Sequence, residues 1–224
     1  TEMVADINPD GGSGPYYLTA SGDTLFFHAE DDVHGAELWR TVEETPPQPC
    51  PDDPGAVCVP DGNATVDADG STIRVDSGNG DVIVRGDRNT VLLGVDFMGT
   101  LTIEGSTNTI RGSSADAWID ALGCGNIITV RRGDDRVTAR CPRGARNEIR
   151  GGRGDDVLRS HGGRVLLKGA TGRDRLIGAG RADVLLGGRG RDVLRGRGGR
   201  DVLRGGWGRD VCRGGSGRDV QRSC

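Results

Sequence analysis

Aliphatic side chains recur every nine residues through the last third of the chain. From Gly151 to Arg222, eight blocks of nine follow one another without an insertion, and each has a glycine-rich half and a three-residue stretch centred on its eighth place. Glycine tolerates the positive φ of tight turns, whereas side chains alternate between the two faces of a strand. We therefore expect turns and short strands whose central side chains point inward, at Leu158, Leu167, Leu176, Leu185, Leu194, Leu203, Cys212 and Gln221.

The same blocks carry an acidic residue two places before the inward position. Seven of the eight blocks have aspartate at their sixth place, and the second block has Val165 instead. Carboxylates repeated at one place of a regular turn are candidate ligands for a cation. These candidates are Asp156, Asp174, Asp183, Asp192, Asp201, Asp210 and Asp219.

A looser form of this rhythm, with asparagine in place of aspartate, extends upstream. Asn108, Asn126 and Asn147 each stand two residues before an isoleucine, and Asn108 and Asn126 are 18 residues apart. Asp81 and Asn89 begin similar but less regular stretches. We expect one solenoid over residues 62–222. The alternative is a separate β-domain over residues 62–150, because a polar residue two places before an aliphatic one is common in strands.

Composition favours repeats over an ordinary globular core. The chain of 224 residues has 40 glycines, 34% hydrophobic residues and 4% aromatic residues, so it is either disordered or built from repeats in which glycine has a fixed place. The regular spacing of the glycines favours repeats. Charge divides the chain, since residues 1–150 hold 25 acidic and 12 basic residues, and residues 151–224 hold eight acidic and 17 basic ones.

The glycine and aspartate places of the C-terminal blocks resemble the RTX (haemolysin-type) nonapeptide repeat family, whose pattern is G-G-x-G-x-D-x-U-x with U aliphatic. The resemblance covers about a third of the chain and implies an all-β fold, a right-handed parallel β-roll with two nonapeptides in each 18-residue coil. Coils stack about 4.8 Å apart, so aspartates 18 residues apart would lie above one another. The family binds calcium, which implies bridging sites at the pairs 156/174, 174/192, 192/210, 183/201 and 201/219.

Calcium suits these residues because it accepts many oxygen ligands in a flexible geometry, whereas magnesium requires a tighter octahedron. Asparagine coils can stack as a neutral amide ladder, so we expect residues 62–150 to be mostly metal-free, with one candidate site near Asp134 and Asp135.

The alternative for the C-terminal blocks is a metal-free solenoid in which neighbouring arginines neutralise the aspartates. Those arginines are Arg173, Arg191, Arg200, Arg209 and Arg218.

The N-terminal residues form a different kind of segment. Residues 1–45 are expected to form short strands, and Glu37, Leu38 and Trp39 resemble part of one ELWxxDGT repeat without its Asp-Gly-Thr end. Residues 46–61 contain six of the nine prolines and are expected to be a stiff linker. The expected organisation is therefore a β segment over 1–45, a linker over 46–61, degenerate coils over 62–150, and a calcium-binding β-roll with a C-terminal cap over 151–224.

The six cysteines fall into three local pairs, separated by eight, 17 and 12 residues. An even count in a glycine-rich chain is typical of an oxidising, extracellular compartment, and the alternative is reduced thiols in a cytosolic protein. A bridge between the last two cysteines would close the end of the solenoid. The expected disulfides are Cys50–Cys58, Cys124–Cys141 and Cys212–Cys224.

Together these features predict a secreted, calcium-dependent structural or adhesive protein and not an enzyme. No serine or cysteine stands in a nucleophile motif, and the three histidines are scattered. The expected partners are calcium ions, other copies of the chain in a head-to-tail filament or extracellular matrix, and an anionic polysaccharide or cell surface. The scarcity of aromatic residues beside the arginines disfavours nucleic acid, and no apolar run approaches the ~20 residues needed to span a membrane.

Two other functions remain open at this stage. One is a module of a polysaccharide-active β-helical enzyme, for which an acid/base pair in an open groove would be the evidence. The other is the secretion tail of a larger secreted enzyme.

Overall fold

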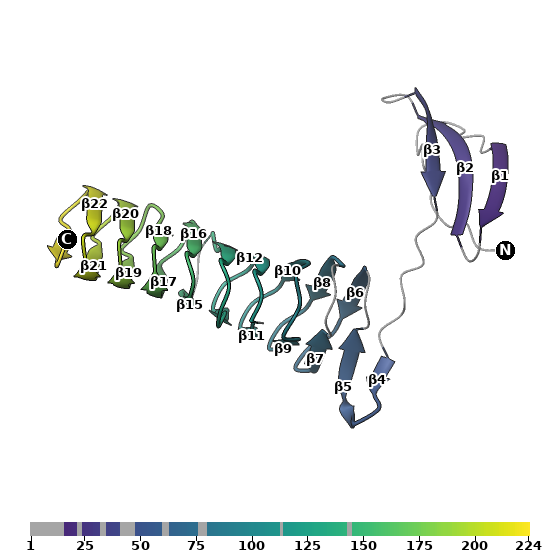
Figure 1. Ribbon diagram of the computed structural model, residues 1–224, viewed down its shortest axis with the longest axis horizontal. Coiled ribbons are helices and arrows are strands. Elements are labelled where there is room, and N and C mark those ends of the chain that lie inside the picture. The colour runs from purple at the N-terminus through teal and green to yellow at the C-terminus, as the bar shows by residue number, and fades with distance from the viewer. Residues whose placement is uncertain are drawn as a thin grey trace. The chain divides into compact units, whose positions relative to one another are not determined.

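A computed structural model describes residues 16–21, 24–31, 35–40, 48–59, 63–75, 80–112, 114–142 and 145–224 (Figure 1). The chain divides into two compact units, Thr1–Glu44 and Thr45–Cys224. The first unit contains an antiparallel sheet in the order β1-β2-β3, formed by β1 (Tyr16–Ser21), β2 (Thr24–Asp31) and β3 (Gly35–Arg40). The resemblance of this segment to an ELWxxDGT repeat stays a prediction.

The second unit is a parallel β-solenoid, because from residue 53 onward strands that follow one another along the chain alternate between two sheets (Figure 1). The nine-stranded sheet contains β6 (Ala64–Asp67), β8 (Val82–Arg85), β10 (Thr100–Glu104), β12 (Trp118–Leu122), β14 (Arg136–Arg140), β16 (Val157–His161), β18 (Arg175–Ile177), β20 (Val193–Gly198) and β22 (Val211–Ser216). The eleven-stranded sheet contains β4 (Gln48–Cys50), β5 (Asp53–Val59), β7 (Thr72–Val75), β9 (Thr90–Leu93), β11 (Thr109–Arg111), β13 (Ile127–Thr129), β15 (Asn147–Arg153), β17 (Val165–Gly172), β19 (Val184–Gly190), β21 (Val202–Gly208) and β23 (Val220–Arg222).

The strand register confirms the 18-residue coil. Val157 pairs with Arg175 in the C-terminal part, and Thr109 pairs with Ile127 in the asparagine coils. Both pairings are parallel and join residues 18 apart. One solenoid therefore runs through both regions, and the structure does not show a separate β-domain over residues 62–150.

Stacked aliphatic columns form the core of the solenoid. Leu158, Leu176 and Leu194 of the nine-stranded sheet belong to the same buried cluster as Leu167 and Leu185 of the eleven-stranded sheet, and all five are 0% exposed. Burying a leucine contributes roughly 1.5–3 kcal/mol relative to leaving it in water. A column of such residues, repeated coil after coil, therefore stabilises a chain that has few aromatic residues.

The last coil is less well covered than the inward pattern suggested. Gln221 pairs with Leu203, as its place in the repeat predicts, but its side chain is exposed. Cys212 is only partly buried. Both residues lie in the last strands of their sheets, so only one side of each is covered by another described strand.

Asp81 does not occupy the place that its spacing suggested. Val82 and Val84 point inward and Ile83 points outward, so the strand is shifted by one residue from the expected pattern. This register buries two valines, whereas the expected one would bury only Ile83. Asp81 consequently lies at the exposed start of β8, where its Oδ1 accepts the backbone N–H of Thr100 at 3.3 Å.

The segment expected as a linker contains two strands. β4 and β5 form an antiparallel hairpin joined by the disulfide Cys50–Cys58, and β5 pairs in parallel with β7. Residues 48–59 thus extend the eleven-stranded sheet. The other two disulfides, Cys124–Cys141 and Cys212–Cys224, join the pairs expected from their spacing.

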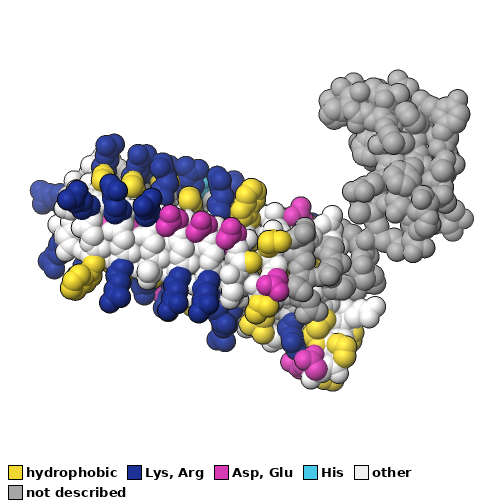
Figure 2. All heavy atoms as spheres, viewed as in Figure 1, with side chains coloured by type: hydrophobic (Ala, Val, Ile, Leu, Met, Phe, Trp, Pro, Cys, Tyr) yellow, Lys and Arg dark blue, Asp and Glu magenta, His cyan; other side chains and the backbone are white. Residues whose placement is uncertain are grey.

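Outward-facing places of the C-terminal coils are rich in arginine. Arg204, Arg213 and Arg222 are exposed on the last strands. Figure 2 shows basic side chains gathered over this end of the solenoid. The basic side chains of residues 151–224 therefore lie mainly on the surface, whereas most of the aspartates of this region are buried.

Candidate calcium sites

The sixth-place aspartates line the inside of two edges of the solenoid, where the chain passes from one sheet to the other. Asp174 and Asp192 precede β18 and β20 on the first edge, and Asp183 and Asp201 precede β19 and β21 on the second. These four residues are at most 1% exposed. We call each inward row a ladder; the first consists of Asp135, Asp156, Asp174, Asp192 and Asp210, and the second of Val165, Asp183, Asp201 and Asp219.

One carboxylate oxygen of each ladder aspartate is satisfied by the preceding coil. Oδ1 of Asp174 accepts the backbone N–H of Asp156 at 3.0 Å, and Oδ1 of Asp192 accepts that of Asp174 at 2.9 Å. On the second edge, Oδ1 of Asp201 accepts the backbone N–H of Asp183 at 2.8 Å. The aspartates therefore stack coil on coil with the 18-residue period that the sequence predicts.

Asparagines of the upstream coils make this bond and a second one. Oδ1 of Asn126 accepts the backbone N–H of Asn108 at 2.8 Å, while Nδ2 of Asn126 donates to the carbonyl oxygen of Gly105 at 2.9 Å. Asn147 repeats the second bond, because its Nδ2 donates to the carbonyl oxygen of Gly123 at 3.0 Å. A neutral amide thus satisfies both of its polar atoms within the ladder, without a cation.

The second oxygen of most ladder aspartates has no donor. An ionised oxygen buried in this way is costly unless a proton or a cation accompanies it. Asp183 differs, because its Oδ2 accepts the backbone N–H of Ala179 at 2.7 Å. Oδ2 is buried without a hydrogen-bond partner in Asp135, Asp156, Asp174, Asp192, Asp201 and Asp210.

Glycine lets the backbone pass close to these oxygens. A Cβ on Gly187 would collide with both Oδ2 of Asp192 and the carbonyl oxygen of Gly205, which lies one coil further on. Gly196 has the same relation to Oδ2 of Asp201 and to the carbonyl oxygen of the glycine 18 residues later. Carboxylate and carbonyl oxygens are the ligands that calcium prefers. The buried, donor-free oxygens and the carbonyl oxygens that approach the same glycines therefore fit a calcium ion.

Burial changes the acidity of the ladder. It raises the pKa of Asp156 to about 8, and neighbouring carboxylates such as that of Asp174 raise it further, against a backbone hydrogen bond that lowers it. Burial likewise raises the pKa of Asp174 and that of Asp135 to about 7, and the pKa of Asp192 in the same direction. Without a cation, these carboxyl groups therefore hold protons at a pH where an exposed aspartate is fully ionised.

The described part of the chain gives no support to neutralisation of the ladder by arginines. Its ion pairs involve other carboxylates, those of Asp52, Glu104, Asp120 and Glu148. In the same part of the chain, no three side chains of His, Cys, Asp or Glu converge on one point. Each ion would accordingly be held by two stacked carboxylates together with backbone carbonyl oxygens, and not by a cluster of side chains alone.

Asp135 is a ladder residue that the nine-residue blocks did not include. Its Oδ1 accepts the backbone N–H of Ala117 at 2.8 Å, and its own N–H donates to Oδ1 of Asp156 at 3.0 Å. Asp135 and Asp156 are 21 residues apart, so the coil between them is three residues longer than the coils that follow it and interrupts the 18-residue period. The available clue was its position, nine residues after Asn126.

Comparison with family models decides the nature of the C-terminal coils. A model described as the RTX calcium-binding nonapeptide repeat (4 copies) matches residues 144–165, 168–203 and 186–221. The C-terminal coils are RTX calcium-binding repeats. The RTX coils contain all seven aspartates named from the sequence, and calcium is the ion that such repeats bind. A solenoid of RTX repeats is a structural, calcium-binding fold.

The other comparisons add less. A model described as a protein of unknown function (DUF3060) matches residues 84–141, which include Asn89, Asn108 and Asn126 of the upstream coils. No curated protein and no solved structure gives a significant match to the chain. Over the described ranges, no helix has the length and apolar character needed to cross a membrane.

Proposed function

We propose that this protein is a secreted structural protein of the extracellular space, whose RTX coils are made rigid by calcium and present an adhesive surface. The observation that carries the proposal is the row of buried Oδ2 oxygens without donors, with carbonyl oxygens of the next coil beside the same glycines. Three disulfides support an extracellular setting, since such bonds persist in oxidising compartments.

The stacked carboxylates would hold the ions. When bound, calcium supplies positive charge that offsets the repulsion between aspartates of successive coils, which is about 1 kcal/mol per neighbour even in water. Oδ1 of each aspartate keeps its bond to the preceding coil, so Oδ2 is the oxygen left for the ion. We propose that the sites lie between the pairs 156/174, 174/192, 192/210, 183/201 and 201/219, and that Asp135 adds a pair with Asp156.

Crowding one of these glycines tests the sites without changing a carboxylate. Gly187→Ala is expected to remove at least one calcium ion per chain, because the new Cβ would collide with Oδ2 of Asp192 and the carbonyl oxygen of Gly205 and push them apart. Gly180→Ala is the matched control, since its Cβ would meet nothing within 4 Å. Calorimetric titration of calcium into both variants decides the matter. Equal numbers and affinities of ions in the two variants would contradict the proposed sites.

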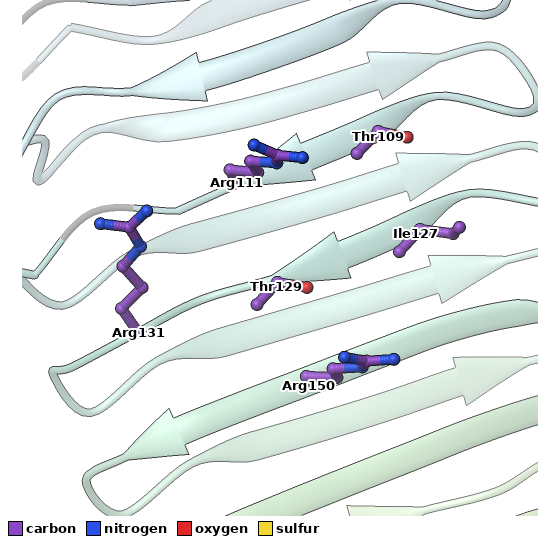
Figure 3. A pocket seen from close by; sticks show the side chains of 6 residues that line it. All are labelled: Thr109, Arg111, Ile127, Thr129, Arg131 and Arg150. Atoms are coloured by element: carbon purple, nitrogen blue, oxygen red, sulfur yellow. The ribbon is translucent and has the colours of Figure 1, made fainter.

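An adhesive role has one specific observation in its favour, a basic hollow on the eleven-stranded sheet. The hollow has a volume of about 430 Å³, and Arg111, Arg131 and Arg150 line it together with Thr109 and Thr129. Figure 3 shows that Arg111, Thr129 and Arg150 lie on three successive coils, with Arg131 beyond the end of its strand. Arg150 pairs with Glu148 at 2.7 Å, whereas Arg111 and Arg131 form no ion pair with any residue that the structure describes.

We propose that this hollow binds the carboxylate or sulfate groups of an acidic polysaccharide. Guanidinium groups bind such anions through paired hydrogen bonds, and the threonine hydroxyls add further donors. Arg111→Ala/Arg131→Ala is expected to weaken binding of the full chain to immobilised heparin at least tenfold. Arg204→Ala/Arg222→Ala removes the same charge from the same sheet outside the hollow. Equal weakening by both double variants would show only a general charge effect and would refute the site.

We propose head-to-tail association of copies through residues 1–45; a chain that lacks residues 1–45 should then give a smaller particle by light scattering in calcium. The rival proposal of a polysaccharide-active enzyme would need an acid/base pair in an open groove. Neither the basic hollow nor the adjoining one, of about 300 Å³, is lined by an aspartate or a glutamate.

A further inference from the structure

An exposed row of charges runs beside the first ladder and changes sign halfway. Oδ1 of Asp116 accepts the backbone N–H of Asp134 at 2.7 Å, and Oδ1 of Asp134 accepts that of Asp155 at 2.7 Å. Oδ1 of Asp155 in turn accepts the backbone N–H of Arg173 at 2.7 Å. The row continues at the same place of the next two coils. We call its six exposed members the two-sign edge: Asp116, Asp134, Asp155, Arg173, Arg191 and Arg209.

The strand register shows that the six residues belong to six successive coils. Each stands two places before the first residue of a strand in the nine-stranded sheet, and these first residues pair in parallel from β12 to β22. Figure 2 shows acidic side chains in a row on the middle of the solenoid, followed by basic ones toward its C-terminal end. The edge thus has three acidic positions and three basic positions of equal spacing.

Nothing in the described part of the chain offsets these charges. None of the six residues forms an ion pair there. Side chains on adjacent coils are about 4.8 Å apart, and like charges at that distance repel by about 1 kcal/mol per neighbour in water. Each half of the edge would therefore be stabilised by a surface that carries the opposite charge with the same spacing.

We propose that two copies of this chain pair side by side and antiparallel through the two-sign edge. A twofold axis between the coils of Asp155 and Arg173 places Asp155 of one copy opposite Arg173 of the other. The same axis places Asp134 opposite Arg191, and it brings the two ends of the edge together. Because the axis repeats every contact, each of the three acid–arginine contacts occurs twice, and the assembly closes as a dimer.

Antiparallel pairing is the arrangement that matches opposite charges coil for coil. Two parallel copies in register would place aspartate against aspartate and arginine against arginine. The antiparallel arrangement also places the coil that contains Trp118 next to the coil that contains Val211 in the second copy. These side chains are 57% and 47% exposed, and both occupy the outward place two residues after the edge. Their contact would add apolar area at both ends of the interface.

This inference does not rest on the proposed function, because the edge uses only exposed side chains. It does require folded RTX coils, so the full chain is measured in calcium after circular dichroism has shown the fold. Exposed ion pairs are individually weak, so we expect a reversible dimer that is sensitive to salt. Sedimentation should show dimers at about 0.02 M salt and single chains at about 0.5 M, where screening is much stronger.

Charge reversal at the edge is the first test. The variant Arg173→Glu/Arg191→Glu/Arg209→Glu makes the whole edge acidic, and it should weaken dimerisation at low salt at least tenfold. The control is Arg164→Glu/Arg200→Glu/Arg218→Glu, which changes net charge equally at exposed places of the second edge and should dimerise like the original chain. An equal effect of both variants, or no effect of either, would overturn the proposal.

A mixing experiment tests the antiparallel geometry itself. Asp116→Asn/Asp134→Asn/Asp155→Asn keeps the Oδ1 acceptors for the next coil but removes the acidic half of the edge. This variant and the glutamate variant should each remain single chains. Mixed together, they should form heterodimers, since the intact arginines of one face the intact aspartates of the other. A mixture that stays monomeric would contradict the pairing.

Discussion

Removing calcium from the whole protein at about pH 8 should unfold the RTX coils and leave the asparagine coils folded. Above the raised pKa values of the ladder, Asp156, Asp174 and their neighbours ionise, and each then carries a buried oxygen without a donor. An unpaired buried charge costs several kcal/mol, whereas a whole domain is stable by only about 5–15 kcal/mol. Several such charges in adjacent coils should exceed that margin.

Hydrogen exchange locates the effect. With a chelator, protection should disappear over residues 151–222 and persist around Asn108 and Asn126, whose amides satisfy the ladder without an ion. Far-UV circular dichroism should lose part of its β signal and regain it with calcium, but poorly with magnesium, which prefers a tighter octahedron. A calcium-free protein that kept full β signal and full protection at this pH would contradict the calcium requirement.

The calcium-free protein should also respond to acid in a defined direction. Burial raises the pKa of Asp156 to about 8 and that of Asp183 to about 6, from an ordinary value of 3.8. Between about pH 4 and pH 8 the folded coils therefore hold protons that the unfolded chain releases, so stability without calcium falls as pH rises. With calcium the slope should reverse, because protons then compete with the ion. Thermal unfolding in chelator at several pH values checks both slopes.

The period of the C-terminal sequence was enough to predict the coil and the stacking of the aspartates, and the local spacing of the cysteines was enough to predict the three disulfides. A nine-residue repeat leaves little freedom, since any other register would bury arginines and expose leucines. Where the repeat weakens, the sequence was less informative. Around Asp81 the spacing suggested that Ile83 points inward, but the strand is shifted by one residue and buries Val82 and Val84 instead.

Other features depend on the third dimension. The sequence indicated a candidate site near Asp134 and Asp135, but the pairing of Asp135 with Asp156 crosses 21 residues, which the 18-residue period does not predict. The two-sign edge spans that same longer coil, between Asp134 and Asp155, so its continuity appears only once the coils are stacked. The hairpin of residues 48–59 was hidden by prolines, which suggested a linker although their strands lie at the end of a sheet, where missing N–H donors are tolerated.

Asparagine in place of aspartate should free the RTX coils from their need for calcium. A chain in which all seven RTX aspartates are replaced by asparagine should fold in chelator at about pH 8 and bind little calcium. The replacement removes every buried carboxylate of the RTX coils but keeps the Oδ1 acceptors for the preceding coil. It also places an amide donor where Oδ2 now has no partner, beside the carbonyl oxygen of Gly205 in the case of Asp192.

Single variants of Asp192 separate the loss of charge from the loss of the hydrogen bond. Asp192→Asn should keep the calcium-free coils folded to a higher pH than the original chain, yet it should raise the calcium concentration needed to fold them at about pH 8. Asp192→Ala should unfold at a lower pH than Asp192→Asn, because it leaves the buried N–H of Asp174 without its acceptor at 2.9 Å, a loss of about 1–3 kcal/mol. Circular dichroism across pH and calcium concentration measures both effects.

If the two variants unfolded at the same pH in chelator, the hydrogen bond from the N–H of Asp174 to Asp192 would contribute nothing to stability. If Asp192→Asn bound calcium as tightly as the original chain, Oδ2 would not be a ligand. The opposite shifts expected for Asp192→Asn in the two conditions follow from one atom, which is an unsatisfied acceptor without calcium and a ligand with it.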